Sequence, residues 1–135
     1  MATCGTISTM VDGKCVGIYT HLDSYPNARI PLLLENYNSQ EMAESIVALG
    51  AISSLRERIS PNEDESHSFD SAIKDVTIAY HRDRDEEFSQ LTGSTKDDVA
   101  EEEYSYHFED GEWLYRDNNW DIDSWEKCSE WAESE

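Results

Sequence analysis

Residues 3–22 read TCGTISTMVDGKCVGIYTHL, and this stretch decides the fold more than any other. Two runs rich in Thr, Ile and Val, Thr3–Val11 and Cys15–Leu22, lie on either side of Asp12-Gly13-Lys14. An Asp-Gly turn between two β-prone runs is the strongest short-range signal for a hairpin. The stretch therefore predicts an antiparallel hairpin at the start of the chain.

A second Asp-Gly pair between two β-prone runs predicts another hairpin in the last third of the chain. Tyr104–Phe108 and Trp113–Tyr115 lie on either side of Asp110-Gly111. Aromatic residues alternate with polar ones along the first of these runs, which predicts one buried face. Between the hairpins, Val76–Tyr80 predicts a further strand, because β-branched and aromatic residues dominate it.

Three segments predict helices. Ile30–Tyr37 is a short one, with Pro31 tolerated in its first turn. Asn38 followed by Glu41 resembles a capping box that opens a second helix, which ends near Gly50. The segment Trp120–Glu135 spaces apolar residues three or four apart, which is typical of a short amphipathic helix.

The remaining segments predict loops. Asp23–Asn27 is a loop because Pro26 favours extended geometry before it. Ala51–Ile59 is compatible with a strand or with irregular chain, and Pro61–Ser71 predicts an exposed loop. Arg82–Asp98 predicts a loop with a helical turn near Phe88–Leu91.

Together these elements predict an α+β fold. We expect an antiparallel sheet of four to five strands, built around the two hairpins, with two or three helices packed on one face. Residues 1–116 would form the compact α+β domain. Residues 117–135 would form an acidic, Trp-rich C-terminal segment, folded as a short helix on that domain.

Several features favour a cytoplasmic protein, which for a viral protein means the cytoplasm of the host cell. No apolar run approaches the roughly 20 residues of a membrane span. The N-terminus lacks a basic region followed by an apolar stretch. The three cysteines, Cys4, Cys15 and Cys128, are odd in number and have no CxxC spacing, which favours reduced thiols over a disulfide framework.

The net charge of −20 is the extreme property of the chain. Residues 1–60 contain four basic and six acidic residues, whereas residues 61–135 contain six and 24. Such a field repels nucleic acid and anionic membranes and attracts basic surfaces. It therefore argues against direct nucleic-acid or membrane binding, although acidity that serves only solubility is an equally open interpretation.

Six segments resemble a family of small phage and prophage proteins. They are Gly17–Pro26, Leu32–Tyr37, Ala48–Leu55, His67–Asp70, Ala79–Arg84 and Tyr104–Trp113. The pattern covers about residues 2–116, and the acidic end after Arg116 is peculiar to this chain. No activity is established for the family, so the resemblance implies a viral origin and a shared fold without a chemistry.

This sequence departs from the family pattern at several positions. The loop of the family usually reads His-Trp-Asp-Gly-Tyr-Pro, from which Leu22 and Ser24 depart. Arginine is usual at the position of Cys4, and glycine at those of His81 and Asp85. The loop departures put a shared ligand site in doubt.

The loop His21–Pro26 is the first candidate site. His21, Asp23 and Tyr25 lie within five residues at a strand end, where they could form an acid/base or ligand site. The alternative, which we favour, is that His21 and Tyr25 pack at the edge of the hairpin while Asp23 caps a turn.

Other chemistries have weaker signals. His81-Arg82-Asp83 matches the start of a kinase catalytic loop, but Phe88 occupies the position of the required Asn, and no glycine-rich loop exists. We therefore interpret residues 81–85 as an exposed run of alternating positive and negative side chains, whose ion pairs with one another are weak. The spacings of the four histidines match no zinc pattern. We therefore predict no catalytic residue, no metal site and no cofactor.

The acidic C-terminal third is the last candidate site. The partner-binding residues predicted there are Glu101, Glu102, Glu103, Asp121, Asp123, Trp120 and Trp125. Fixed carboxylates with tryptophan anchors could occupy a basic groove as a DNA mimic. The rival interpretation is a solvated acidic tail whose tryptophans pack on the domain.

The leading hypothesis is a phage-encoded protein, not an enzyme, that inhibits or modulates a host protein with a basic, nucleic-acid-binding surface, in anti-defence or host takeover. A small-ligand-binding or catalytic protein that uses the loop His21–Pro26 is the first alternative. An accessory viral protein whose acidity serves solubility is the second. The sequence is also compatible with a homodimer.

Overall fold

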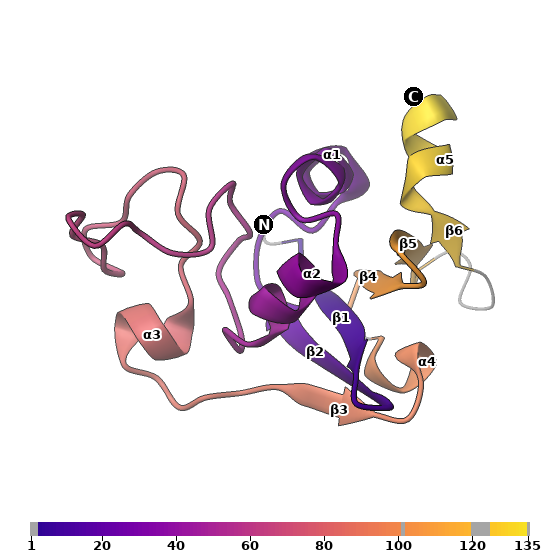
Figure 1. The fold of residues 1–135 in the computed structure, drawn as a ribbon, viewed down its shortest axis with the longest axis horizontal. Coiled ribbons are helices and arrows are strands. Elements are labelled where there is room, and N and C mark those ends of the chain that lie inside the picture. Colours follow the sequence, from indigo (N-terminus) through magenta and orange to yellow (C-terminus); the bar gives the residue numbers. More distant parts are fainter. Residues whose placement is uncertain (1–2, 101, 120–124, 135) are drawn as a thin grey trace.

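The computed structural model describes residues 3–100, 102–119 and 125–134. Within these residues the chain forms one six-stranded sheet with strand order β3-β2-β1-β4-β5-β6 (Figure 1). The strands are β1 (Gly5–Val11), β2 (Lys14–Thr20), β3 (Leu91–Gly93), β4 (Tyr104–Glu109), β5 (Glu112–Asp117) and β6 (Glu126–Lys127). The helices are α1 (Pro26–Asn36), α2 (Gln40–Val47), α3 (Tyr80–Arg84), α4 (Lys96–Val99) and α5 (Cys128–Ser134). The α+β class is as predicted, with more strands and helices than expected.

Both predicted hairpins are present, β1–β2 and β4–β5. At the first turn, Asp12 and Gly13 have φ values of 50° and 81°. At the second, Asp110 and Gly111 have φ values of 53° and 82°. Positive φ at both central residues is the geometry of a type I′ turn, whose twist matches that of the flanking strands.

The sheet is not wholly antiparallel, which corrects the prediction. Strands β1 and β4 pair in parallel, with Ile7 opposite Tyr106, while every other pair of neighbouring strands in the described sheet is antiparallel. A parallel pair needs a long crossover connection. The chain between β1 and β4 runs through β2, α1, α2, the irregular segment, α3, β3 and α4, so no short-range sequence signal indicates this pairing.

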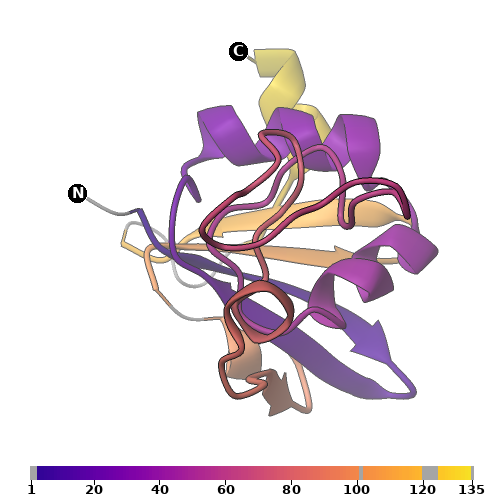
Figure 2. The ribbon, with the colours of Figure 1, turned by 90° about the vertical axis from the view of Figure 1, so that its left-hand side faces the viewer.

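The helices lie on both faces of the sheet, not on one as predicted. In Figures 1 and 2, α1, α2 and α5 lie on one face, where they cover the apolar core. The largest side chains buried there are Trp113, Tyr37, Tyr106 and Phe108. The short helix α4 covers the other face, where the side chain of Val99 lies against Gly17 of β2.

The face under α4 is polar as well as buried, so β4 has two buried faces instead of the single one expected. Ser105 of β4 accepts a hydrogen bond of 2.9 Å from Thr6 of β1. One pair further along, Ser8 Oγ lies 2.8 Å from His107 Nδ1. The ring of His107 is fully buried.

Residues 76–80 do not form the strand that their composition predicts. They make only isolated bridges, Arg58 to Val76 and Ile52 to Ala79, and Tyr80 begins α3. The side chains of Val76, Thr77 and Ala79 are buried, so the apolar composition reflects burial without strand pairing.

Three predicted helix details are also wrong. Helix α1 begins at Pro26, four residues before the predicted start, because Pro26 fits the first helical position. The N-cap of α2 is Ser39, whose Oγ accepts from Met42 N–H at 3.2 Å, and not Asn38. The chain near Phe88 is not helical, and Leu91 begins β3 instead.

The C-terminal segment packs on the same core as the rest of the chain. Strand β6 pairs with β5, Cys128 is fully buried, and Trp131 packs partly buried against the core. No helix in the described residues is long and apolar enough to cross a membrane.

Candidate functional site

The predicted loop after β2 is held by its backbone. His21 N–H and Leu22 N–H donate to the carbonyl oxygens of Ile52 and Ser53, at 3.1 and 2.8 Å. Ser24 N–H donates to Thr3 O at 3.0 Å. The loop is therefore fixed against two other segments of the chain before any side chain contributes.

Arg29 of α1 anchors the loop from inside. Its guanidinium donates to three carbonyl oxygens, those of Leu22, Asp23 and Leu55, at 3.1 to 3.2 Å. Burial lowers the pKa of Arg29 to about 10, so the side chain stays charged at neutral pH. A buried cation held only by carbonyl oxygens favours a nearby negative charge, which Asp23 supplies.

Asp23 lies at the rim of an open pocket of about 270 Å³. Its Oδ2 accepts a hydrogen bond of 3.0 Å from Ser54 Oγ and lies 3.7 Å from Arg56 Nη1. The pocket is lined by Asp23, Tyr25, Ala28, Arg29, Leu32, Ser54, Leu55, Arg56 and Glu57. The structure thus places Asp23 and Tyr25 in one pocket and adds Ser54 and Arg56, which no spacing in the sequence singled out.

His21 does not line that pocket. Its Nδ1 lies 2.8 Å from the hydroxyl of Tyr19, and the same hydroxyl lies 3.1 Å from Cys4 Sγ. The three predicted loop residues therefore do not form one acid/base site. The contact with Tyr19 joins β2 to the first residue after the strand, since β2 ends at Thr20.

Many acidic residues of the last third lie on β5, β6 and α5 or at the two ends of the interior strand β4, and these elements are on the right of Figure 1. We define the acidic edge as the carboxylates Glu102, Glu103, Asp110, Asp117, Glu126, Glu130 and Glu133. Each described cation in this part of the chain is already paired. Lys96 contacts Glu109 at 2.9 Å, Arg116 contacts Asp97 at 2.8 Å, and Lys127 contacts Glu112 at 3.6 Å. None of the seven carboxylates of the acidic edge forms an ion pair within the described residues.

Trp125 attaches the start of the C-terminal segment to the polar face of the sheet. Its Nε1–H donates to Asp97 Oδ1 at 3.0 Å, and the guanidinium carbon of Arg116 lies 5.0 Å from its ring centroid. The ring of His107 lies 6.2 Å away on the same face. Because Trp125 is only partly buried, its remaining surface is open to a partner.

The predicted partner-binding residues fall into two groups. Glu102, Glu103 and Trp125 lie on or beside the acidic edge. The other predicted residues, Glu101, Trp120, Asp121 and Asp123, lie outside the described residues. Of the remaining tryptophans, Trp113 is a core residue whose Nε1–H donates to Tyr37 O at 2.9 Å.

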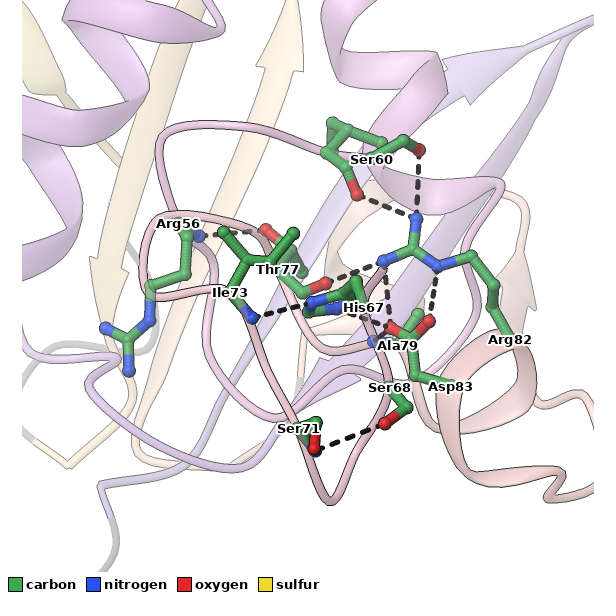
Figure 3. Close-up of polar contacts among 11 residues, drawn as sticks. Arg56, Ser60, His67, Ser68, Ser71, Ile73, Thr77, Ala79, Arg82 and Asp83 are labelled. Carbon is green, nitrogen blue, oxygen red and sulfur yellow. Dashed lines mark hydrogen bonds and ion pairs between the residues drawn. The ribbon is translucent and has the colours of Figure 1, made fainter. Parts of the chain in front are cut away.

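The predicted alternating-sign run is exposed at His81, Arg82, Arg84 and Asp85, but its member Asp83 belongs to a polar network with a buried side chain (Figure 3). The carboxylate of Asp83 accepts from Arg82 Nε at 2.8 Å and from Ala79 N–H at 2.9 Å, and lies 3.3 Å from His67 Nε2. Its side chain is only 4% exposed. Arg82 also donates to Ile59 O at 2.7 Å, so the network ties the irregular segment to α3. We interpret it as a structural element, since its polar groups are used in holding the chain.

The histidines do not gather at a metal site. Within the described part of the chain, no group of three or more His, Cys, Asp or Glu side chains is arranged to hold a metal ion. Comparisons with protein-family models, with curated proteins and with solved structures found no match to this chain. The resemblance to phage proteins therefore stays a prediction.

Proposed function

We propose that this is a phage-encoded acidic protein that binds a basic, nucleic-acid-binding surface of a host protein through the acidic edge. One observation carries the proposal. Four of the seven unpaired carboxylates lie on elements that pack on the domain, Asp117 on β5, Glu126 on β6 and Glu130 and Glu133 on α5, so the backbone that carries them is held in place. A solvated tail would not fix them in this way.

The packing of α5 supports this interpretation. Cys128 enters the core and Trp131 covers it, while Glu126, Glu130 and Glu133 on the same segment are exposed. Because the backbone that carries these charges is already ordered, binding costs less entropy than it would for a flexible tail, and negative charges accelerate the encounter with a basic groove. The surface next to Trp125 offers aromatic area of the kind that anchors interfaces.

The proposal predicts that charge reversal at the acidic edge abolishes partner binding. The test variant carries Glu126→Lys, Glu130→Lys and Glu133→Lys, all at exposed positions. The matched control carries Glu63→Lys, Asp64→Lys and Glu87→Lys, exposed positions outside the acidic edge with the same change in net charge. Each protein is immobilised and exposed to a bacterial host lysate, and the retained proteins are identified by mass spectrometry.

We expect the parent and the control variant to retain the same basic protein and the test variant to lose it. Circular dichroism of each variant verifies folding. If both variants lose the partner equally, net charge alone is responsible and the acidic edge is not the interface. If both retain it, the acidity serves solubility only.

The pocket beside Asp23 favours a second candidate function, the binding of a small polar ligand. Carboxylate, hydroxyl and guanidinium groups meet there beside the apolar side chains of Leu32 and Leu55. Under the main proposal, Asp23→Ala and Arg56→Ala, both at residues that line the pocket, leave partner binding within a few-fold of the parent. A folded double mutant that loses all biological activity would instead support the pocket as the functional site.

A further inference from the structure

Cys4, Tyr19 and His21 form a chain of polar atoms at the end of β2, and none of them lines the pocket beside Asp23. Cys4 Sγ lies 3.1 Å from Tyr19 Oη, and Tyr19 Oη lies 2.8 Å from His21 Nδ1. His21 is exposed, and the other two residues are partly buried. A cysteine sulfur thus lies two hydrogen bonds from an imidazole that reaches solvent.

The same atoms satisfy two charge states of this chain. When all three groups are neutral, the thiol donates to the tyrosine oxygen and the tyrosine hydroxyl donates to Nδ1. After a proton moves along the chain, Nδ1–H donates to the tyrosine oxygen and the hydroxyl donates to a thiolate. No heavy atom has to move between the two states.

Tyr19 is suited to relay a proton without ionising. Burial, followed by its hydrogen bond with Cys4, raises the pKa of Tyr19 well above its ordinary value, so the phenol stays protonated. The other titratable groups that act on it are Glu102 and Tyr80. A carboxylate nearby opposes a thiolate but favours an imidazolium, so any activation of the sulfur comes through the relay and not from the local field.

We propose that Cys4 is a reactive thiol, activated by His21 through Tyr19, that exchanges with small disulfides. The proton of the thiol passes through Tyr19 to His21, and the sulfur attacks one sulfur of the disulfide. The bond between the two disulfide sulfurs breaks, and a mixed disulfide forms on Cys4. The leaving thiolate takes the proton from His21. The disulfide is itself the oxidant, so the step needs no other reagent.

The other two cysteines are internal controls. Cys15 and Cys128 are fully buried, and burial raises the pKa of both thiols, that of Cys128 to about 12. Neither should react while the protein is folded, because the thiolate is the nucleophile. A fast reaction of one thiol per chain is therefore assignable to Cys4.

The test follows the reaction of the folded protein with 2,2′-dithiodipyridine, a neutral disulfide whose approach the negative protein does not repel. We expect one fast equivalent of released pyridinethione at about pH 7, located on Cys4 by mass spectrometry and absent in Cys4→Ser. Tyr19→Phe and His21→Ala should each slow it by about tenfold or more. The difference should shrink near pH 9.5, where ordinary thiols, with a pKa of about 8.5, ionise without help.

A merely structural role for Tyr19 gives a different result. If Tyr19→Phe and His21→Ala both react at the parent rate at both pH values, the relay does not exist and the proposal is overturned. His21→Ala changes an exposed side chain, so it keeps the test decisive even if Tyr19→Phe fails to fold. The proposal is also overturned if Cys15 or Cys128 reacts as fast as Cys4.

Discussion

Asp23 has a φ of 58°, in the left-handed region that only Gly, Asn and Asp adopt with ease. Its carboxylate also accepts from Ser54 and contacts Arg56. We predict that Asp23→Ala lowers the free energy of unfolding by about 2 kcal/mol, since it adds backbone strain and removes the acceptor. Asp23→Asn should cost less than about 1 kcal/mol, because Asn tolerates this φ and keeps an acceptor. Urea unfolding measures both, and equal losses would contradict the strained conformation.

His107 should make stability depend on pH. Burial lowers the pKa of His107 from 6.5 to about 4, while Glu109 opposes this shift. The unfolded chain binds a proton as the pH falls through about 6.5, whereas the folded chain stays neutral until about 4. The stabilisation by neutral His107 is therefore complete above pH 6.5 and is lost as the pH falls toward 4.

The matched variant for this prediction is His107→Gln, which keeps an acceptor beside Ser8 but does not titrate. The stability of the parent relative to this variant should fall by about 2.5 kcal/mol between about pH 7 and about pH 4.5. Urea unfolding at the two pH values gives the difference. If both proteins lose stability in parallel, His107 is not held neutral in the folded state.

The candidate site could be predicted only in part at this scale. His21, Asp23 and Tyr25 were singled out because they are close in sequence. His21 contacts Tyr19 of the preceding strand, whereas the loop brings Asp23 toward Ser54 and Arg56, some 30 residues further along the chain. Contacts between such distant residues depend on the crossover, for which a single sequence has no signal.

At the scale of elements, the cap of α2 gives a direct test. Ser39→Ala should lower the free energy of unfolding by about 1 kcal/mol, because it removes the acceptor for Met42 N–H. Asn38→Ala, at an exposed neighbouring position, should change it by less than about 0.5 kcal/mol. Thermal or urea unfolding compares the two variants. A larger loss of stability in Asn38→Ala would show that Asn38, and not Ser39, is the N-cap of α2.

The elements that were predicted correctly are those specified by residues close together in the sequence. Asp12-Gly13 and Asp110-Gly111 specify their turns through residues that tolerate positive φ. Residues 76–80 were mispredicted because buried irregular chain and a strand need the same apolar side chains. The hydrogen bonds that decide between them, such as Thr77 N–H to Arg58 O at 2.9 Å, depend on a distant segment.

For the whole molecule, charge distribution is the main functional feature. The net charge of −20 destabilises a compact chain through self-repulsion, so its concentration in the last third has an energetic cost. Ion pairs offset part of that cost around Lys96, Arg116 and Lys127. Under our proposal, a basic partner binds the unpaired acidic edge and would stabilise the protein when bound.

Competition with duplex DNA tests this account most directly. The partner captured on the immobilised protein is washed with increasing duplex DNA at constant salt, and the fraction that stays bound is measured. The account predicts that duplex DNA displaces the partner, because both ligands occupy one basic surface. In a separate wash without DNA, rising salt should also release the partner, since screening over about 8 Å weakens its attraction to the fixed carboxylates. A partner that stays bound at saturating DNA, or whose retention ignores both DNA and salt, would contradict nucleic-acid mimicry by the acidic edge.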